Sequence, residues 1–248
     1  MKSLVKTIYI TASISPGSSG GAVVNDKGEL IGISSLTVKD GQNLNFAIPI
    51  DDVLSVEIGS YSNRDAFKDF ELFSKGLNAA KNGEYKEAIE YLSRYIEIYP
   101  NSSAAYNNRG LSKKNLGDSR GATEDFNKAI EINPNGYIAF INRGHVKYKL
   151  LDYSGAMWDY SKAIELNPYD AEAYINRGYL KGELEDYIGA IKDFSKAIEL
   201  NPDYAVAYYN RAITKHRLND IAGACLDLSK AGELGYYDAY EVIREICD

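Results

Sequence analysis

The hydrophobic residues of this chain follow a pattern that returns every 34 residues over more than two-thirds of its length. The related stretches AYNNRG, AFINRG, AYINRG and AYYNRA begin at Ala105, Ala139, Ala173 and Ala207. A more divergent copy, ELFSKG, begins at Glu71, again 34 residues earlier. A period of this size is typical of stacked supersecondary units.

Within each unit the apolar spacing predicts two amphipathic helices. A proline closes four of the units and stops the second helix, at Pro100, Pro134, Pro168 and Pro202. An aspartate stands before four of the second helices, where it can accept hydrogen bonds from the first amides: Asp118, Asp152, Asp186 and Asp220. We expect five repeats over residues 69–235, at about 69–102, 103–136, 137–170, 171–204 and 205–235, and a capping helix over 236–248.

Residues 1–58 have a different pattern, with short apolar runs that are typical of strands. Strands are predicted at residues 4–12, 21–25, 29–33 and 44–50. Gly59–Arg64 has turn composition, which indicates a linker over residues 59–68. The predicted fold is therefore mainly α, with a small β segment in front of the helical array.

The repeat pattern resembles the tetratricopeptide repeat (TPR), an α-solenoid of helix-turn-helix units. That family places a large residue early in the first helix, a glycine four residues later, and alanines and an aromatic residue on the second helix. The first two positions match Tyr106, Phe140, Tyr174 and Tyr208, followed by Gly110, Gly144 and Gly178. The second helices match at Ala122, Ala156, Ala190 and Ala224, at Phe126, Tyr160 and Phe194, and at Ala129, Ala163, Ala197 and Ala231. The last repeat departs from the pattern, with Ala212 for the glycine and Leu228 for the aromatic residue.

The β segment resembles the C-terminal part of a trypsin-like serine protease of the HtrA group. The resemblance rests on SISPGSSGGAVVNDKGELIGISS and on GQNLNFAIPI, and it covers about the first 50 residues. In that family a GxSGG loop carries the nucleophile, which corresponds to Ser19. The resemblance places the oxyanion-hole amides at Gly17 and Ser19.

The catalytic histidine and aspartate of that family precede the serine along the chain. The 18 residues before Ser19 contain neither, and both histidines, His145 and His216, fall within the repeats. A serine hydroxyl without a base is a weak nucleophile. We therefore expect this chain alone to be inactive, with Ser19 vestigial or incomplete, and the native protein either to begin upstream of Met1 or to cover this segment with another surface.

The TPR resemblance also indicates where a partner would bind, because the first helices of TPR arrays line a concave groove. An asparagine recurs there once per repeat, at Asn108, Asn142, Asn176 and Asn210. An amide donates and accepts, so it can bridge the backbone of an extended peptide, as similar asparagines do in peptide-binding TPRs; the alternative is that it bonds to a neighbouring helix. Further candidate partner-binding residues are His145, Tyr148, Tyr179, Tyr209 and His216.

An arginine follows each of these asparagines, and an aspartate recurs on each second helix. The arginines are Arg109, Arg143, Arg177 and Arg211, and the aspartates are Asp125, Asp159, Asp193 and Asp227. We interpret them as structural ion pairs between the two helices of a repeat.

Composition adds limits on the partner and the compartment. The net charge of −7 and the pI near 5.1 argue against nucleic acid and anionic membranes. No cofactor or metal site is expected, since the two histidines lie two repeats apart with no ligand cluster around them. The chain as given indicates a cytoplasmic protein without membrane insertion, and a periplasmic or extracellular one if its start is truncated. Cys225 and Cys247 lie on either side of the predicted turn at residue 236, so they could face each other. They would be free thiols in a reducing compartment and could form one disulfide in an oxidising one.

Two functions remain open from the sequence. The first is an interaction scaffold that binds a peptide or protein partner in the TPR groove. The second is the C-terminal part of a trypsin-like serine endopeptidase with a TPR adaptor, in which Ser19 acts once an upstream histidine and aspartate are supplied.

Overall fold

The computed structural model describes residues 8–9, 22–24, 30–33 and 63–247. Ser19, Gly17 and the strand predicted at residues 44–50 lie outside these residues. The chain divides into two compact units, residues 1–116 and residues 117–248.

The first unit begins with a three-stranded antiparallel sheet in the order β1-β2-β3, formed by β1 (Ile8–Tyr9), β2 (Ala22–Val24) and β3 (Leu30–Ile33). Each strand lies within a range that the apolar pattern predicts. Ile8 pairs with Val24, and Tyr9 pairs with Val23. The pairing of β2 with β3 carries an irregularity between Val23 and Val24.

The first unit continues with three helices, α2 (Asn63–Lys81), α3 (Tyr85–Ile98) and α4 (Ser103–Asn115). Helix α2 packs against α3, and α3 packs against α4. Buried Phe73, Leu92 and Ile96 form their core together with Ala105. Helix α2 begins inside the range expected to be a linker.

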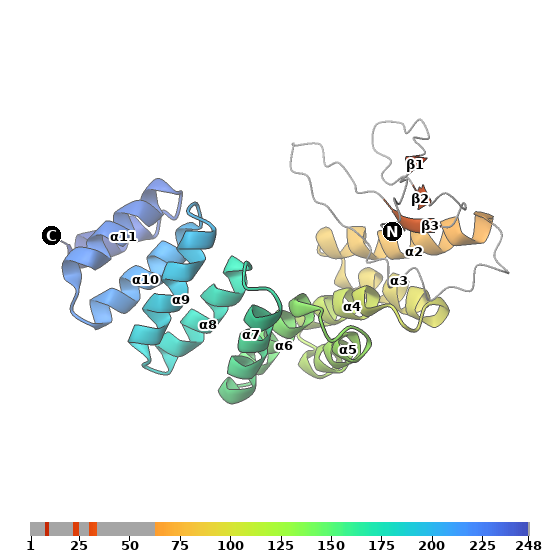
Figure 1. The fold of residues 1–248 in the computed structure, drawn as a ribbon, viewed down its shortest axis with the longest axis horizontal. Coiled ribbons are helices and arrows are strands. Elements are labelled where there is room, and N and C mark those ends of the chain that lie inside the picture. Colours follow the sequence, from red (N-terminus) through yellow and green to blue (C-terminus); the bar gives the residue numbers. More distant parts are fainter. Residues whose placement is uncertain (1–7, 10–21, 25–29, 34–62, 248) are drawn as a thin grey trace, which may run out of the picture. The chain divides into compact units, whose positions relative to one another are not determined.

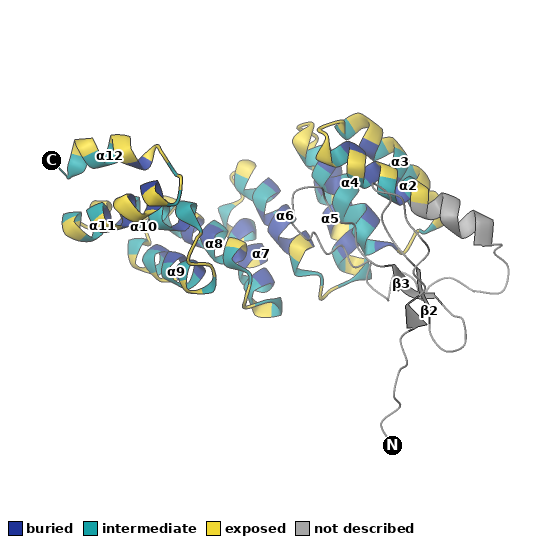
Figure 2. Cartoon of the chain, turned by 90° about the horizontal axis from the view of Figure 1, so that it is seen from above, coloured by how far each residue is buried: buried dark blue, intermediate teal, exposed yellow. Residues whose placement is uncertain are grey.

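The second unit is a succession of helices. They are α5 (Ser119–Ile132), α6 (Tyr137–Lys149), α7 (Tyr153–Leu166), α8 (Ala171–Glu183), α9 (Tyr187–Leu200), α10 (Ala205–Arg217), α11 (Ile221–Glu233) and α12 (Ala239–Ile246). Each of them packs against the next along the chain (Figure 1). Many exposed residues gather at the turns, whereas buried residues face neighbouring helices (Figure 2). None of the helices in the described residues is long and apolar enough to cross a membrane.

The helix starts follow the predicted caps. Asp118, Asp152, Asp186 and Asp220 each accept a hydrogen bond from the backbone N–H of the glycine three residues later. Such a cap satisfies an amide that has no partner within the helix. Two first helices, α4 and α8, have caps that were not predicted. Ser102 accepts a hydrogen bond from the Ala105 amide, and Asp170 accepts one from the Ala173 amide.

The turn between the two helices of a repeat requires one residue with positive φ, directly before the capping aspartate. Gly117 and Asn219 fill this position with residue types that tolerate it, whereas Leu151 and Glu185 adopt the same φ of 63°. A left-handed conformation costs a branched or long side chain more than it costs glycine or asparagine. Leu151 is also 70% exposed, so its side chain gains little burial in return.

The close approach of the two helices in a repeat depends on a pair of matched residues. A Cβ at Gly144 would lie 2.6 Å from Cε1 of Tyr160, and one at Gly178 would lie 2.9 Å from Cε1 of Phe194. In the last repeat Ala212 and Leu228 belong to one fully buried cluster. The two departures from the TPR pattern therefore compensate, since the larger residue on α10 meets a smaller one on α11.

Helix α12 closes the second unit. Its residues Val242, Ile243 and Ile246 pack on the core around Leu228 and Ala231. A disulfide joins Cys225 on α11 to Cys247, directly after α12. The structure therefore shows the paired form of the two cysteines.

Candidate functional site

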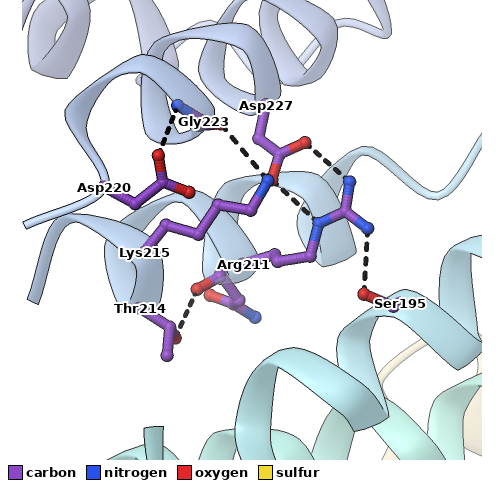
Figure 3. A network of polar contacts seen from close by, with 8 residues as sticks. Ser195, Arg211, Thr214, Lys215, Asp220, Gly223 and Asp227 are labelled. Atoms are coloured by element: carbon purple, nitrogen blue, oxygen red, sulfur yellow. Dashed lines mark hydrogen bonds and ion pairs between the residues drawn. The ribbon is translucent and has the colours of Figure 1, made fainter. Parts of the chain in front are cut away.

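A buried ion network joins the two helices of the last repeat. Arg211 on α10 donates two hydrogen bonds to Asp227 on α11, from Nε at 2.8 Å and from Nη2 at 2.7 Å. Lys215, one turn further along α10, forms an ion pair with the same carboxylate at 2.8 Å (Figure 3). The Asp227 side chain is only 7% exposed, so two cations compensate one nearly buried carboxylate.

The network recurs in the two preceding repeats of the second unit. Asp159 binds Arg143 and Lys147, and Asp193 binds Arg177 and Lys181. The hydrogen bond with Asp193 raises the pKa of Arg177 above its ordinary value. The predicted arginine–aspartate pairs are confirmed in these repeats. The contribution of the lysine was not predicted, although a lysine recurs every 34 residues, at Lys113, Lys147, Lys181 and Lys215.

The arginine of each network also reaches the preceding repeat. Nη1 of Arg143 donates to Oδ1 of Asn127 at 2.7 Å, and Nη1 of Arg211 donates to Oγ of Ser195 at 3.0 Å (Figure 3). In the first unit, Nη1 of Arg109 donates to Oγ of Ser93 at 3.1 Å. Nε, Nη1 and Nη2 of Arg143 and Arg211 therefore each donate a hydrogen bond within the array, which indicates a structural function.

The asparagines of the predicted ladder lie in different environments. Asn108, in the first unit, donates from Nδ2 to the Ala104 carbonyl at 2.8 Å, which is a bond within its own helix. In the second unit Asn142 is only 8% exposed, whereas Asn176 and Asn210 are half-buried. Nδ2 of Asn176 is buried and has no hydrogen-bond partner among the described residues. A buried amide donor without a partner is costly, and among the four asparagines only Asn176 shows one in the described residues.

Two of the predicted aromatic residues lie together. The ring centroids of Tyr148 on α6 and Tyr179 on α8 are 5.8 Å apart in an edge-to-face arrangement. The ring centroid of Tyr153 lies 5.6 Å from that of Tyr148. Burial, and then a hydrogen bond with Tyr179, raise the pKa of Tyr148 above its ordinary value. Tyr179 is 45% exposed and presents an aromatic surface to solvent.

The remaining predicted residues are dispersed. His145 packs edge-on against Tyr160, with ring centroids 5.7 Å apart. Tyr209 stacks against Tyr236 at 4.6 Å, in the segment that leads to α12, and burial raises its pKa. His216 is exposed near the end of α10. The structure therefore gathers Tyr148 and Tyr179, one helical turn from His145 and Asn176, whereas Tyr209 lies against the segment before the cap.

Comparison with known families matches the helical array and the segment before it to two different families. Residues 72–102, 103–135, 171–204 and 194–225 match the tetratricopeptide repeat. Residues 4–56 match trypsin.

Known proteins show similarity to each part separately. A "Serine protease HtrA-like" of Staphylococcus aureus (strain USA300) is 44% identical over 55 residues, which are 21% of this chain and 7% of that relative. This chain thus spans a small fraction of the curated relatives that it matches. The solved structure of MamA from Desulfovibrio magneticus RS-1 has a TM-score of 0.60 at 24% identity, over 68% of this chain and 96% of that one. YrrB, described as a TPR protein with an unusual peptide-binding site, has a TM-score of 0.57 at 22% identity, over 70% of this chain and 90% of that one.

Proposed function

Because the helical array is built of tetratricopeptide repeats and follows a segment similar to trypsin, we propose that this chain is an interaction scaffold. The first helices of its repeats in the second unit, α6, α8 and α10, bind an extended segment of a peptide or protein partner. The chain by itself carries out no catalysis.

The observation that carries this proposal is the amide of Asn176. Its Nδ2 is buried without a hydrogen-bond partner among the described residues, and Tyr179 follows one turn later on the same helix face. The Asn176 residue as a whole is half-buried, so a turn of its side chain would bring the amide to a peptide carbonyl, and the half-exposed Tyr179 ring would supply apolar contact. The description of YrrB as peptide-binding supports the same class of ligand for this fold.

The proposal is tested with peptides selected from a random display library on the purified chain. Asn176→Ala should lower the affinity for the selected peptides at least tenfold in calorimetric titration. The melting temperature should stay nearly unchanged, because Nδ2 of Asn176 has no hydrogen bond among the described residues to lose. Lys192→Ala, an exposed position on α9, is the matched control and should change neither. Unchanged affinity with a lower melting temperature would assign Asn176 to the scaffold instead.

A second function has support from a specific observation, the match to trypsin and the 44% identity to an HtrA-like protease. In this alternative the chain is the C-terminal part of a serine endopeptidase and the repeats recruit its substrates. Ser19 would attack the peptide carbonyl, and the amides of Gly17 and Ser19 would stabilise the oxyanion. A histidine and an aspartate from upstream residues would complete the site.

A fluorophosphonate probe separates the two functions. The chain of residues 1–248 should remain unlabelled, as should its Ser19→Ala variant. Labelling that disappears in Ser19→Ala would establish a working nucleophile. An in-frame histidine and aspartate upstream of Met1, with labelling of that longer chain, would establish the endopeptidase.

The pairing of Cys225 with Cys247 supports an oxidising compartment for this scaffold, since such bonds persist mainly outside the cytoplasm. Labelling of free thiols in freshly lysed cells tests this, with no labelling expected before reduction.

A further inference from the structure

The C-terminal end of helix α8 carries a charge opposite to that of its two neighbours. Glu183 is the last residue of α8, and it lies 34 residues after Lys149, the last residue of α6, and 34 residues before Arg217, the last residue of α10. All three residues are exposed. The same place in three consecutive repeats therefore holds a cation, a carboxylate and a cation.

The fold does not explain the carboxylate of Glu183. The C-terminal end of a helix carries a partial negative charge, so a cation is favourable there and a carboxylate is not. Within the described part of the chain Glu183 forms no ion pair. The two basic residues of its own helix, Arg177 and Lys181, are both bound to Asp193. The charge of Glu183 can therefore be met by a cation of a partner.

An aromatic pair lies beside this carboxylate. Tyr179 precedes Glu183 by four residues, so the two side chains lie on the same face of α8. Tyr179 is 45% exposed, and its ring contacts Tyr148 on α6 edge-to-face, with centroids 5.8 Å apart. Burial is the main cause of the raised pKa of Tyr148, and the charge of Glu183 contributes to it, which places this carboxylate near the pair of rings.

A carboxylate next to an exposed aromatic ring fits a guanidinium group. Arginine can stack its planar group on a ring and donate to a carboxylate at the same time, whereas lysine offers a point charge without a flat surface. The interior of the same repeat already combines these three groups. Cζ of Arg177 lies 5.7 Å from the ring centroid of Tyr174, while Nε and Nη2 donate to Asp193 at 2.9 and 2.8 Å.

We propose that Tyr179 and Glu183 form a binding site for one arginine side chain of the partner. The guanidinium lies against the Tyr179 ring and pairs with the Glu183 carboxylate. The cations at the ends of α6 and α10 repel an arginine, so the site is confined to α8 and sets the register of the bound segment. This inference rests on the proposed function, because the partner segment supplies the arginine.

The test compares peptides selected from one random display library on the purified chain and on its Glu183→Lys variant. Peptides selected on the wild type should share an arginine, and peptides selected on Glu183→Lys should not. Replacing this arginine by alanine in a synthetic peptide should lower the affinity at least about tenfold in calorimetric titration. Replacement by lysine should lower it by a smaller factor, because the charge remains and the stacking is lost.

Two conservative variants locate the arginine on the chain. Glu183→Gln and Tyr179→Leu should each lower the affinity for the arginine peptide severalfold and change that for the alanine peptide little. The melting temperature of Glu183→Gln should stay the same or rise, because a carboxylate leaves the end of a helix. Glu165→Gln is the matched control, since it removes the same charge from an exposed position of α7, and it should leave both affinities unchanged.

Three outcomes would overturn the site. The first is a set of wild-type peptides without a shared arginine, and the second is equal affinity for the arginine and alanine peptides. The third is an equal loss of affinity in Glu165→Gln and Glu183→Gln, which would show a general attraction of a basic peptide to a chain with a net charge of −7.

The result is separable from the test of the proposed function. Peptides that lose affinity in Asn176→Ala, but bind equally well to Glu183→Gln, would leave the scaffold function standing and remove this site. Arginine-dependent binding with unchanged affinity in Asn176→Ala would retain the site and remove the proposed contact with Asn176. A library that yields no peptide on the wild type would remove the proposed function and this site with it.

Discussion

The repeats at residues 137–170 and 171–204 have the same ion network between their two helices. They differ at other positions of the first helix. Each has a bidentate arginine–aspartate pair with a lysine 2.8 Å from the same carboxylate. Along α6 and α8, in contrast, His145 corresponds to Tyr179 and Tyr148 to Gly182. The ion network between the two helices is copied from repeat to repeat, whereas His145 and Tyr148, which pack on α7, are replaced in the next repeat. Partner specificity is therefore expected to lie in the replaced positions.

The largest expected effect comes from breaking a copied position. Asp159 is fully buried between Arg143 and Lys147, so Asp159→Ala leaves two cations without their carboxylate. Removing one member of a buried ion network costs about 3–5 kcal/mol. Urea unfolding followed by circular dichroism should show this loss.

Glu165→Ala is the control for that variant. Glu165 pairs with Lys162 on the surface and is 68% exposed, so the change should cost less than about 1 kcal/mol. Equal losses in the two variants would show that burial of the network does not determine stability.

A smaller effect is expected from Gly144→Ala, which places a Cβ 2.6 Å from the Tyr160 ring. Overpacking of this kind costs about 1–3 kcal/mol. Adding Tyr160→Leu reproduces the Ala212–Leu228 combination of the last repeat and should recover part of the loss. A double-mutant cycle measures the coupling, and strictly additive effects would contradict the volume compensation inferred for the last repeat.

The turns give a still smaller effect, with the opposite sign. Leu151→Gly should stabilise the chain by about 0.5–1 kcal/mol, because it relieves a positive φ at the cost of some flexibility in the unfolded chain. Asn219→Gly, at the equivalent turn, should change the free energy of unfolding much less, since asparagine already tolerates this conformation. Thermal melting of both variants checks the difference, and a destabilised Leu151→Gly would show that the leucine side chain contributes a contact.

The smallest effect depends on pH. The Gly155 amide donates to Asp152 and lowers the pKa of that carboxyl in the folded chain. Its contribution is therefore present above the ordinary aspartate pKa of about 3.9 and is lost as the pH falls through the lowered value. Asp152→Asn retains the capping oxygen but does not titrate. The melting-temperature difference between wild type and Asp152→Asn should shrink between about pH 5 and pH 2, and a constant difference would exclude this linkage.

Much of this fold could be predicted from the sequence, because each signal acts locally. The 34-residue period predicted the repeats. The aspartates predicted where the second helices begin, and the prolines predicted where they end. The arginine–aspartate pairs were also predictable, since both members recur with the same period.

The candidate site was harder to predict, because exposure depends on several helices at once. Asn142 and Asn176 are identical in the repeat pattern, yet only Asn176 has a buried amide nitrogen without a partner among the described residues. Tyr209 stacks on Tyr236, and its orientation depends on the segment before the cap.

The disulfide at the end of the second unit also limits how this array can grow. Arrays of this kind lengthen when a unit is duplicated and the copy stacks on an existing end. Here α12 occupies the apolar end of the last repeat, and the bond between Cys225 and Cys247 holds it in place. A further unit could stack on this face only by displacing α12 against the disulfide that anchors it.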